Sequence, residues 1–85
     1  MKRIIEDASD NGLVKLLGEK VTFFSLNYIY TGKLTGVNER YIELSEPSIV
    51  YETGDFAEKN WKDAQELPDT IYLMLSSVEA FGIVK

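Results

Sequence analysis

The sequence of 85 residues contains no cysteine and no histidine. The first absence excludes disulfides and thiolate metal sites, and the second removes the commonest metal ligand and general base. No apolar run approaches the roughly 18 residues of a membrane-spanning helix, and the first ten residues, MKRIIEDASD, lack the apolar centre of a signal peptide. We therefore expect a cytoplasmic protein that has no metal, no cofactor and no contact with a membrane.

The length predicts a single domain over residues 1–85, and the 45% of hydrophobic residues excludes a disordered chain. The net charge of −5 argues against nucleic acid as a partner. However, residues 52–69 contain six acidic residues and two lysines, which makes −4 in that segment alone. The rest of the chain is close to neutral, so a local basic patch is still compatible with the composition.

The pattern predicts a short helix followed by five strands. Residues 9–17, SDNGLVKLL, place three leucines on one helical face, and Gly18 is in position to end the helix. An earlier helix that uses Ile4 and Ile5 is the alternative. Runs rich in aromatic and β-branched residues then predict the strands. These strands are expected at residues 21–26, 28–37, 41–53, 70–75 and 80–84.

Residues 54–69, GDFAEKNWKDAQELPD, separate the third strand from the fourth and lack strand alternation. We expect a connecting insert with a helical turn or two. Asp55 is in position to cap such a turn, and Glu58 and Lys62 have the favourable spacing of four residues for an ion pair on a helix.

Two glycines, Gly32 and Gly36, lie four residues apart within the second expected strand. Glycine weakens a strand, and it often marks a bend, a bulge or a close approach of another backbone. Many short strands in so small a domain predict a barrel or a strongly bent sheet, so we expect the long strand to bend at these glycines. The alternative is that Gly36 only starts the next turn. Pro47 marks a bulge, bend or edge in the third strand.

The spacing Tyr30-x-Gly32-x-Leu34-x-Gly36 resembles the first motif of the Sm/LSm proteins. The preceding helix, the Leu-Gly before the first strand and the run Tyr41–Leu44 are also similar to that family. The order of the expected helix and strands is similar to that family over nearly the whole chain. The motif itself covers only residues 30–44. It implies a mainly β, five-stranded, strongly bent Sm-like (SH3-like) barrel with a short N-terminal helix. Another SH3-like small barrel is the alternative, and the chain also looks like short bacterial and phage proteins.

The resemblance implies a site for RNA in the turn after the second strand. Asn38 stands near the family's aspartate and Tyr41 near its asparagine, whereas the arginine–glycine pair of the second family motif is missing. A hydrogen-bonding amide, the charge of Arg40 and a stacking ring are groups that bind single-stranded nucleic acid. The basic residues that would support this site are four: Lys15, Lys20, Lys33 and Arg40. For the turn, the alternative is a plain polar turn with Tyr41 packed on the sheet. For the basic residues, the alternative is an ordinary solvated surface without a ligand.

Of the properties considered, self-association is the one that the sequence pattern supports best. The fourth expected strand, TIYLML, is apolar on both faces, with Tyr72 and Met74 alternating with Ile71, Leu73 and Leu75. The fifth strand, with Phe81 and Ile83, is similar. An exposed apolar edge invites strand pairing, and head-to-tail pairing that closes forms a ring. In Sm-like proteins, the fourth strand of one subunit pairs with the fifth strand of the next. Alternatively, the N-terminal helix and the insert cover these residues.

No catalytic constellation can be named without histidine, cysteine or a phosphate-binding loop, and alternation places Glu43 on a solvent face. We therefore expect a non-catalytic homo-oligomeric ring that binds RNA or single-stranded DNA. The alternative is a protein-interaction or assembly module, phage-related in kind, without nucleic acid. In that case Phe56 and Trp61 of the acidic insert would meet a protein partner, unless these rings fold back on the barrel.

Overall fold

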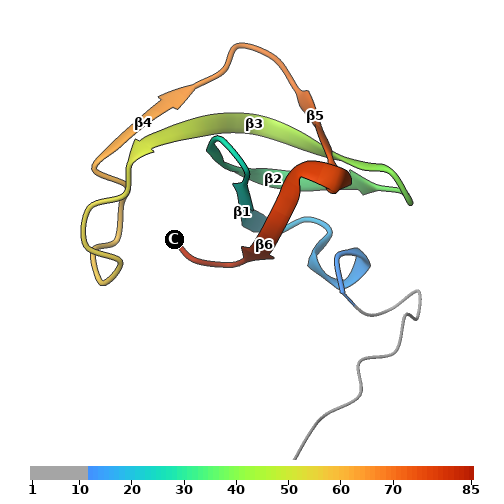
Figure 1. The fold of residues 1–85 in the computed structure, drawn as a ribbon, viewed down its shortest axis with the longest axis horizontal. Coiled ribbons are helices and arrows are strands. Elements are labelled where there is room, and N and C mark those ends of the chain that lie inside the picture. The colour runs from blue at the N-terminus through green and yellow to red at the C-terminus, as the bar shows by residue number, and fades with distance from the viewer. Residues whose placement is uncertain (1–11) are drawn as a thin grey trace, which may run out of the picture.

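The computed structural model describes residues 12–85, which form one antiparallel sheet of six strands and two short 3-10 helices (Figure 1). The chain is mainly β, as predicted. In chain order the elements are η1 (Val14–Leu16), β1 (Lys20–Ser25), β2 (Ile29–Val37), β3 (Tyr41–Glu52), β4 (Asp63–Glu66), β5 (Ile71–Met74), η2 (Leu75–Ser77) and β6 (Val78–Gly82).

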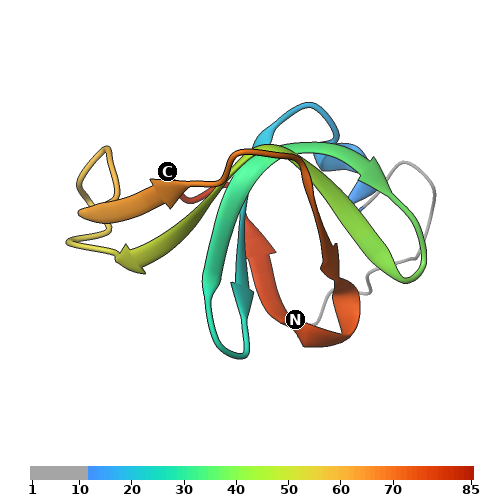
Figure 2. The ribbon, with the colours of Figure 1, turned by 90° about the horizontal axis from the view of Figure 1, so that it is seen from above.

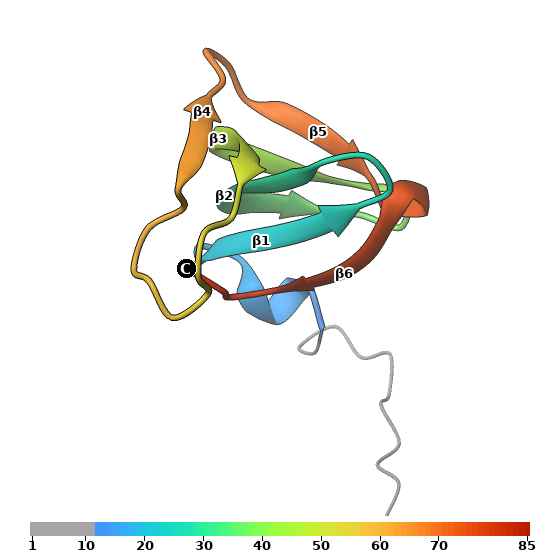
Figure 3. The ribbon, with the colours of Figure 1, turned by 60° about the vertical axis from the view of Figure 1, so that its left-hand side comes forward.

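The strand order is β4-β3-β2-β1-β6, and β5 pairs with β3 as well. One edge of the long strand β3 therefore has two partners: β5 pairs with its first part and β4 with its last part. The sheet curls from β3 through β2 and β1 to β6, and η2 joins β5 directly to β6 (Figure 3). The sheet is not closed into a barrel, since β5 and β6 do not pair within residues 12–85.

The core lies on the inner side of the curled sheet. Its buried side chains come from four strands and pack together: Val21, Phe23, Leu34, Ile42, Leu44 and Leu73. Alternation along β5 is as predicted, because Leu73 is buried and Ile71 and Leu75 pack on the core, whereas Tyr72 and Met74 are exposed. The core therefore uses one face of β5 and leaves the other face, also apolar, at the surface.

The first glycine in β2 lies at a bulge between β2 and β3. β3 has one extra residue between Ser45 and Ser48, opposite Gly32, and Glu46 in this bulge has a φ of 49°. A Cβ atom on Gly32 would lie 3.1 Å from both the Cα of Pro47 and the carbonyl oxygen of Ser45. Gly32 is therefore required by the close approach of another backbone, one of the roles predicted for it.

The second glycine lies at a bulge of the opposite kind. Here β2 has the extra residue, between Leu34 and Gly36. The insertion shifts the alternation by one, so Val37, and not Gly36, packs on the core after Leu34. A bend was predicted at these glycines, and the structure has a bulge in the pairing of β2 with β3 at each of them.

The predicted N-terminal helix is not confirmed. Part of residues 9–17 and the alternative at Ile4 and Ile5 lie outside the described residues, and the described part contains only the 3-10 helix Val14–Leu16. The backbone gives one reason, because Gly12, inside the predicted helix, has a φ of 62°, which an α-helix does not accept. Gly18 does end the helical turn, as expected.

The predicted helical turns in the insert are also absent. Asp55 caps only a single turn, where its Oδ1 accepts a hydrogen bond from the backbone N–H of Ala57 at 2.9 Å. Lys62 pairs with Glu52 at 3.4 Å instead of with Glu58. The later part of the insert forms β4, an additional strand that projects with the end of β3 from the rest of the sheet (Figure 2). Pairing satisfies backbone groups of β3 that would otherwise form a free edge.

Among residues 12–85, no helix is both long and apolar enough to cross a membrane.

Candidate functional site

The two strands at the ends of the curled sheet carry most of the predicted interface residues. Within residues 12–85, β5 pairs only with β3, and β6 pairs only with β1. Each strand therefore has one edge without a partner. The side chains predicted for an oligomer interface are all substantially exposed: Tyr72 by 60%, Met74 by 51%, Phe81 by 43% and Ile83 by 60%. The structure brings unpaired backbone and exposed apolar side chains together on these two strands.

On the outer face of β5, Tyr72 is held in place by its neighbours. Its hydroxyl donates a hydrogen bond to Oε2 of Glu43 at 2.9 Å. Its ring is nearly perpendicular to the Tyr41 ring, at 88°, and the two ring centroids are 5.7 Å apart. Thr35 donates to Oε1 of the same carboxylate at 2.8 Å. The hydrogen bonds from Thr35 and then Tyr72 lower the pKa of Glu43, and the bond to Glu43 raises the pKa of Tyr72. The aromatic surface on β5 is therefore pre-ordered.

On β6, Phe81 has a contact in its own chain. It lies opposite Phe23 in the register with β1, and the two ring centroids are 6.1 Å apart. Phe81 thus covers the open end of the core while a large part of its ring faces solvent. Ile83 follows the end of β6 and is more exposed.

The turn between β2 and β3 is explained by its own hydrogen bonds. Oδ1 of Asn38 accepts hydrogen bonds from the backbone N–H groups of Arg40 at 2.8 Å and Tyr41 at 2.9 Å. The carbonyl oxygen of Arg40 accepts a hydrogen bond from the N–H of Leu75, which connects the turn to η2. Of the groups predicted to bind a base, the amide oxygen of Asn38 is therefore already occupied, and the ring of Tyr41 packs on Tyr72.

Lys33 lies elsewhere, beside an open polar groove of about 1190 Å³. It is directly opposite Lys20 in the pairing of β1 with β2, and both lysines line this groove. Three carboxylates also line it, those of Glu46, Glu66 and Asp69. The structure thus brings two of the four predicted basic residues together, in surroundings of mixed charge, while Lys15 and Arg40 are not among the groove residues.

The two aromatic residues of the insert pack on each other. The rings of Phe56 and Trp61 are nearly perpendicular, at 85°, with centroids 6.1 Å apart. Trp61 is partly buried and lines a smaller pocket together with Thr31 and Ser48 of the sheet, whereas Phe56 is 54% exposed. The ammonium group of Lys85 lies over both rings. Sequence reasoning missed Lys85, because the carbonyl oxygens that accept its hydrogen bonds lie 25 to 32 residues away in the chain and no local spacing indicates them.

Comparisons of the chain with protein-family models, curated proteins and solved structures returned no match. The chemistry of the surface is therefore the basis for a functional conclusion. Within residues 12–85, its most unusual feature is the unpaired edge of β5, because that strand has the sequence IYLM, with neither a charge nor a proline to protect it. The other unpaired strand, β6, contains one charged residue, Glu79. By contrast, the exposed strand β4, DAQE, carries two acidic residues.

Proposed function

We propose that the protein is a non-catalytic assembly module that forms homo-oligomers by pairing β5 of one copy with β6 of the next. The observation that carries this proposal is that both strands have an unpaired edge within residues 12–85 and expose apolar side chains beside it. Pairing would satisfy the backbone groups of both edges and remove Tyr72, Met74, Phe81 and Ile83 from water. The contact joins two different surfaces, so repetition produces a closed ring or an open filament.

The resemblance to Sm-like proteins supports a ring. In that family the fourth strand of one subunit pairs with the fifth strand of the next, and β5 and β6 are the fourth and fifth strands predicted from this sequence. The same resemblance supports an Sm-like fold, in which neighbouring copies would complete the pairing that a single chain leaves open between β5 and β6.

Replacing Tyr72 by lysine tests the interface. Tyr72 is exposed, so Tyr72→Lys should split the oligomer and leave the sheet folded, because a charge at an edge opposes pairing. Light scattering measures the mass, and circular dichroism measures the fold. Gln65→Lys, on the exposed strand β4, is the matched control and should leave the mass unchanged. An oligomer of unaltered mass in Tyr72→Lys would exclude this interface.

A second candidate function is binding of RNA or single-stranded DNA along the groove. The observation that favours it is the cross-strand pair of Lys20 and Lys33 at the groove. Fluorescence anisotropy of labelled single-stranded oligomers at two salt concentrations tests it. Binding that weakens with salt and is lost in Lys33→Glu would support phosphate contacts, and absence of binding at low salt would exclude this function. Arg40→Glu serves as a comparison, because Arg40 does not line the groove.

A further inference from the structure

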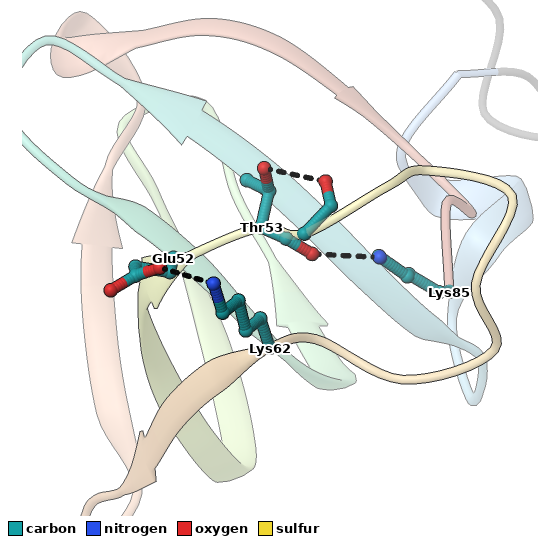
Figure 4. A network of polar contacts seen from close by, with 5 residues as sticks. Glu52, Thr53, Lys62 and Lys85 are labelled. Atoms are coloured by element: carbon teal, nitrogen blue, oxygen red, sulfur yellow. Dashed lines mark hydrogen bonds and ion pairs between the residues drawn. The ribbon is translucent and has the colours of Figure 1, made fainter.

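The ammonium group of Lys85 is enclosed by the loop that follows β3. Its Nζ donates hydrogen bonds to the carbonyl oxygens of Thr53 and Asp55, both at 2.9 Å, and of Asn60 at 3.2 Å. Figure 4 shows the side chain of Lys85 reaching toward the carbonyl of Thr53. A lysine ammonium has three N–H donors, so each donor of Lys85 has a backbone acceptor.

Two aromatic rings complete the enclosure. The Nζ atom lies 4.7 Å from the centroid of the Trp61 ring and 5.5 Å from that of the Phe56 ring. Both distances are within the range of about 6 Å in which a cation is attracted to a ring face. The ion pair found among residues 12–85 joins Lys62 to Glu52, and no carboxylate pairs with Lys85 there. The site therefore recognises an ammonium ion with carbonyl dipoles and aromatic faces.

The loop builds this site from its own backbone. Gly54 has a φ of 69°, which turns the chain directly after Thr53, and a Cβ atom there would lie 3.1 Å from the Cβ of Lys62. The carbonyl oxygen of Thr53 also accepts a hydrogen bond from the N–H of Lys62, and Asp55 caps the turn at Ala57. These contacts orient the carbonyl groups of Thr53 and Asp55 without involving Lys85.

We propose that residues 53–61 form an ammonium cage whose ligand class is the lysine side chain, that Lys85 is its resident occupant, and that a lysine of another polypeptide can replace it. Lys85 reaches the cage on segment 83–85, which follows β6, and within residues 12–85 no strand pairs with that segment. Replacement therefore needs no opening of the sheet. A tethered occupant competes with an external one, so removal of Lys85 should raise the affinity for free lysine ligands. The proposal does not depend on the assembly of β5 with β6.

The test uses the lysine analogue Nα-acetyl-lysine amide, with Trp61 as reporter because it is the single tryptophan of the chain. Lys85→Ala should show a saturable change in tryptophan fluorescence, at least about tenfold tighter than the unmodified protein, in which the resident lysine competes. The Nε-acetylated analogue, which has no charge, should not bind. The Nε-trimethylated analogue, which keeps the charge but has no N–H donor, should bind at least about tenfold more weakly.

Lys59→Ala is the matched control, because it removes an exposed lysine of the same loop and leaves the resident occupant in place. This variant should behave as the unmodified protein does. No saturable response in Lys85→Ala, or an equal response to the acetylated analogue, would overturn the proposal.

A second measurement covers the case in which Lys85→Ala loosens the loop. In the unmodified protein, nuclear magnetic resonance of the lysine ammonium groups should find one group with slowed proton exchange, and its signal should be missing from the spectrum of Lys85→Met. Equal exchange at every lysine would show that no cage encloses the ammonium group and would overturn the proposal.

Discussion

Strands β4 and β5 pair with the same edge of β3, yet they are held there by different forces. In β5, Leu73 is only 7% exposed and belongs to the core. In β4, all four residues are exposed, and none joins the core. β5 is thus stabilised by burial and β4 mainly by its backbone hydrogen bonds. The comparison shows that one long strand can support a core strand and a peripheral strand, of which only the first has an apolar inward face.

The boundary between the two halves of β3 lies at the bulge opposite Gly32. Leu44 is the last residue of β3 that pairs with β5, and Ser48 is the first that pairs with β4. Pro47, which lies between them, is buried, and a Cβ atom on Gly32 would lie 3.1 Å from its Cα. The bulge separates the two regions, because it changes the alternation of β3 at the point where the partner strand changes from β5 to β4.

The largest expected difference between the two strands is in the free energy of unfolding that is lost when one side chain of each is truncated. Leu73→Ala should lower the free energy of unfolding by about 2–5 kcal/mol, because it opens a cavity in the core. Gln65→Ala in β4 should change it by no more than about 0.5 kcal/mol, as for other exposed positions. Urea denaturation of both variants measures the difference. Equal losses would show that β4 contributes to the core as much as β5 does.

A methyl group added at Gly32, at the bulge between the two halves of β3, should lower the free energy of unfolding by an intermediate amount. Gly32→Ala should destabilise the protein by about 1–3 kcal/mol, because its Cβ would meet the backbone of Ser45 and Pro47 at 3.1 Å. Gly82→Ala is the control, since apart from its chain neighbours no atom of residues 12–85 lies within 4 Å of a Cβ atom there, and its effect should stay within about 0.5 kcal/mol. Thermal unfolding checks the pair. If both substitutions destabilised the protein equally little, the backbones of β2 and β3 at the bulge would be able to move apart without loss of stability.

Acid should slightly weaken the contacts that Glu43 makes on the outer face of β5. The folded state lowers the pKa of Glu43, so the stabilisation from its hydrogen bonds with Thr35 and Tyr72 is complete above the ordinary pKa of 4.5 and is lost as the pH falls through the folded pKa. Stability measured between pH 3 and pH 6 should therefore lose part of its pH dependence in Glu43→Gln. An identical profile in both proteins would contradict this assignment.

The contribution of Tyr72 to stability depends on pH in the opposite direction to that of Glu43. The folded state raises its pKa above 10.0, so the contribution of its hydroxyl donor is present below that value and is lost as the pH rises through the folded pKa. The absorbance of tyrosinate above pH 10 would show a late-titrating residue, which should disappear in Tyr72→Phe.

Much of the fold could be predicted because it follows from local alternation. The five expected strands are present within a few residues of their predicted bounds, and the inward and outward faces of β5 are correct. The prediction of the insert was wrong, because DAQE has no strand pattern and becomes β4 only by pairing with β3. Likewise, the open sheet depends on whether β5 and β6 meet in space, which no local pattern encodes.

The residues of the candidate site also fall into those that the sequence pattern could predict and those that depend on contacts distant in the chain. The apolar residues Tyr72 and Met74 could be assigned to the surface because they alternate with core residues. The turn residue Asn38 was assigned to base binding from its place in a motif, whereas its oxygen serves the turn. Lys85 could not be found at all, because its acceptors belong to a loop distant in the chain.

By itself, the sequence determined which residues face the core and where the long strand has its irregular points, because alternation and glycine act over a few neighbouring residues. Only the tertiary structure decided that β3 shares one edge between β4 and β5, and that the loop after β3 encloses Lys85. It also decided that β5 and β6 each keep an edge that no other strand of residues 12–85 pairs with. These outcomes depend on contacts between distant segments, and their geometry exists only once the sheet has curled.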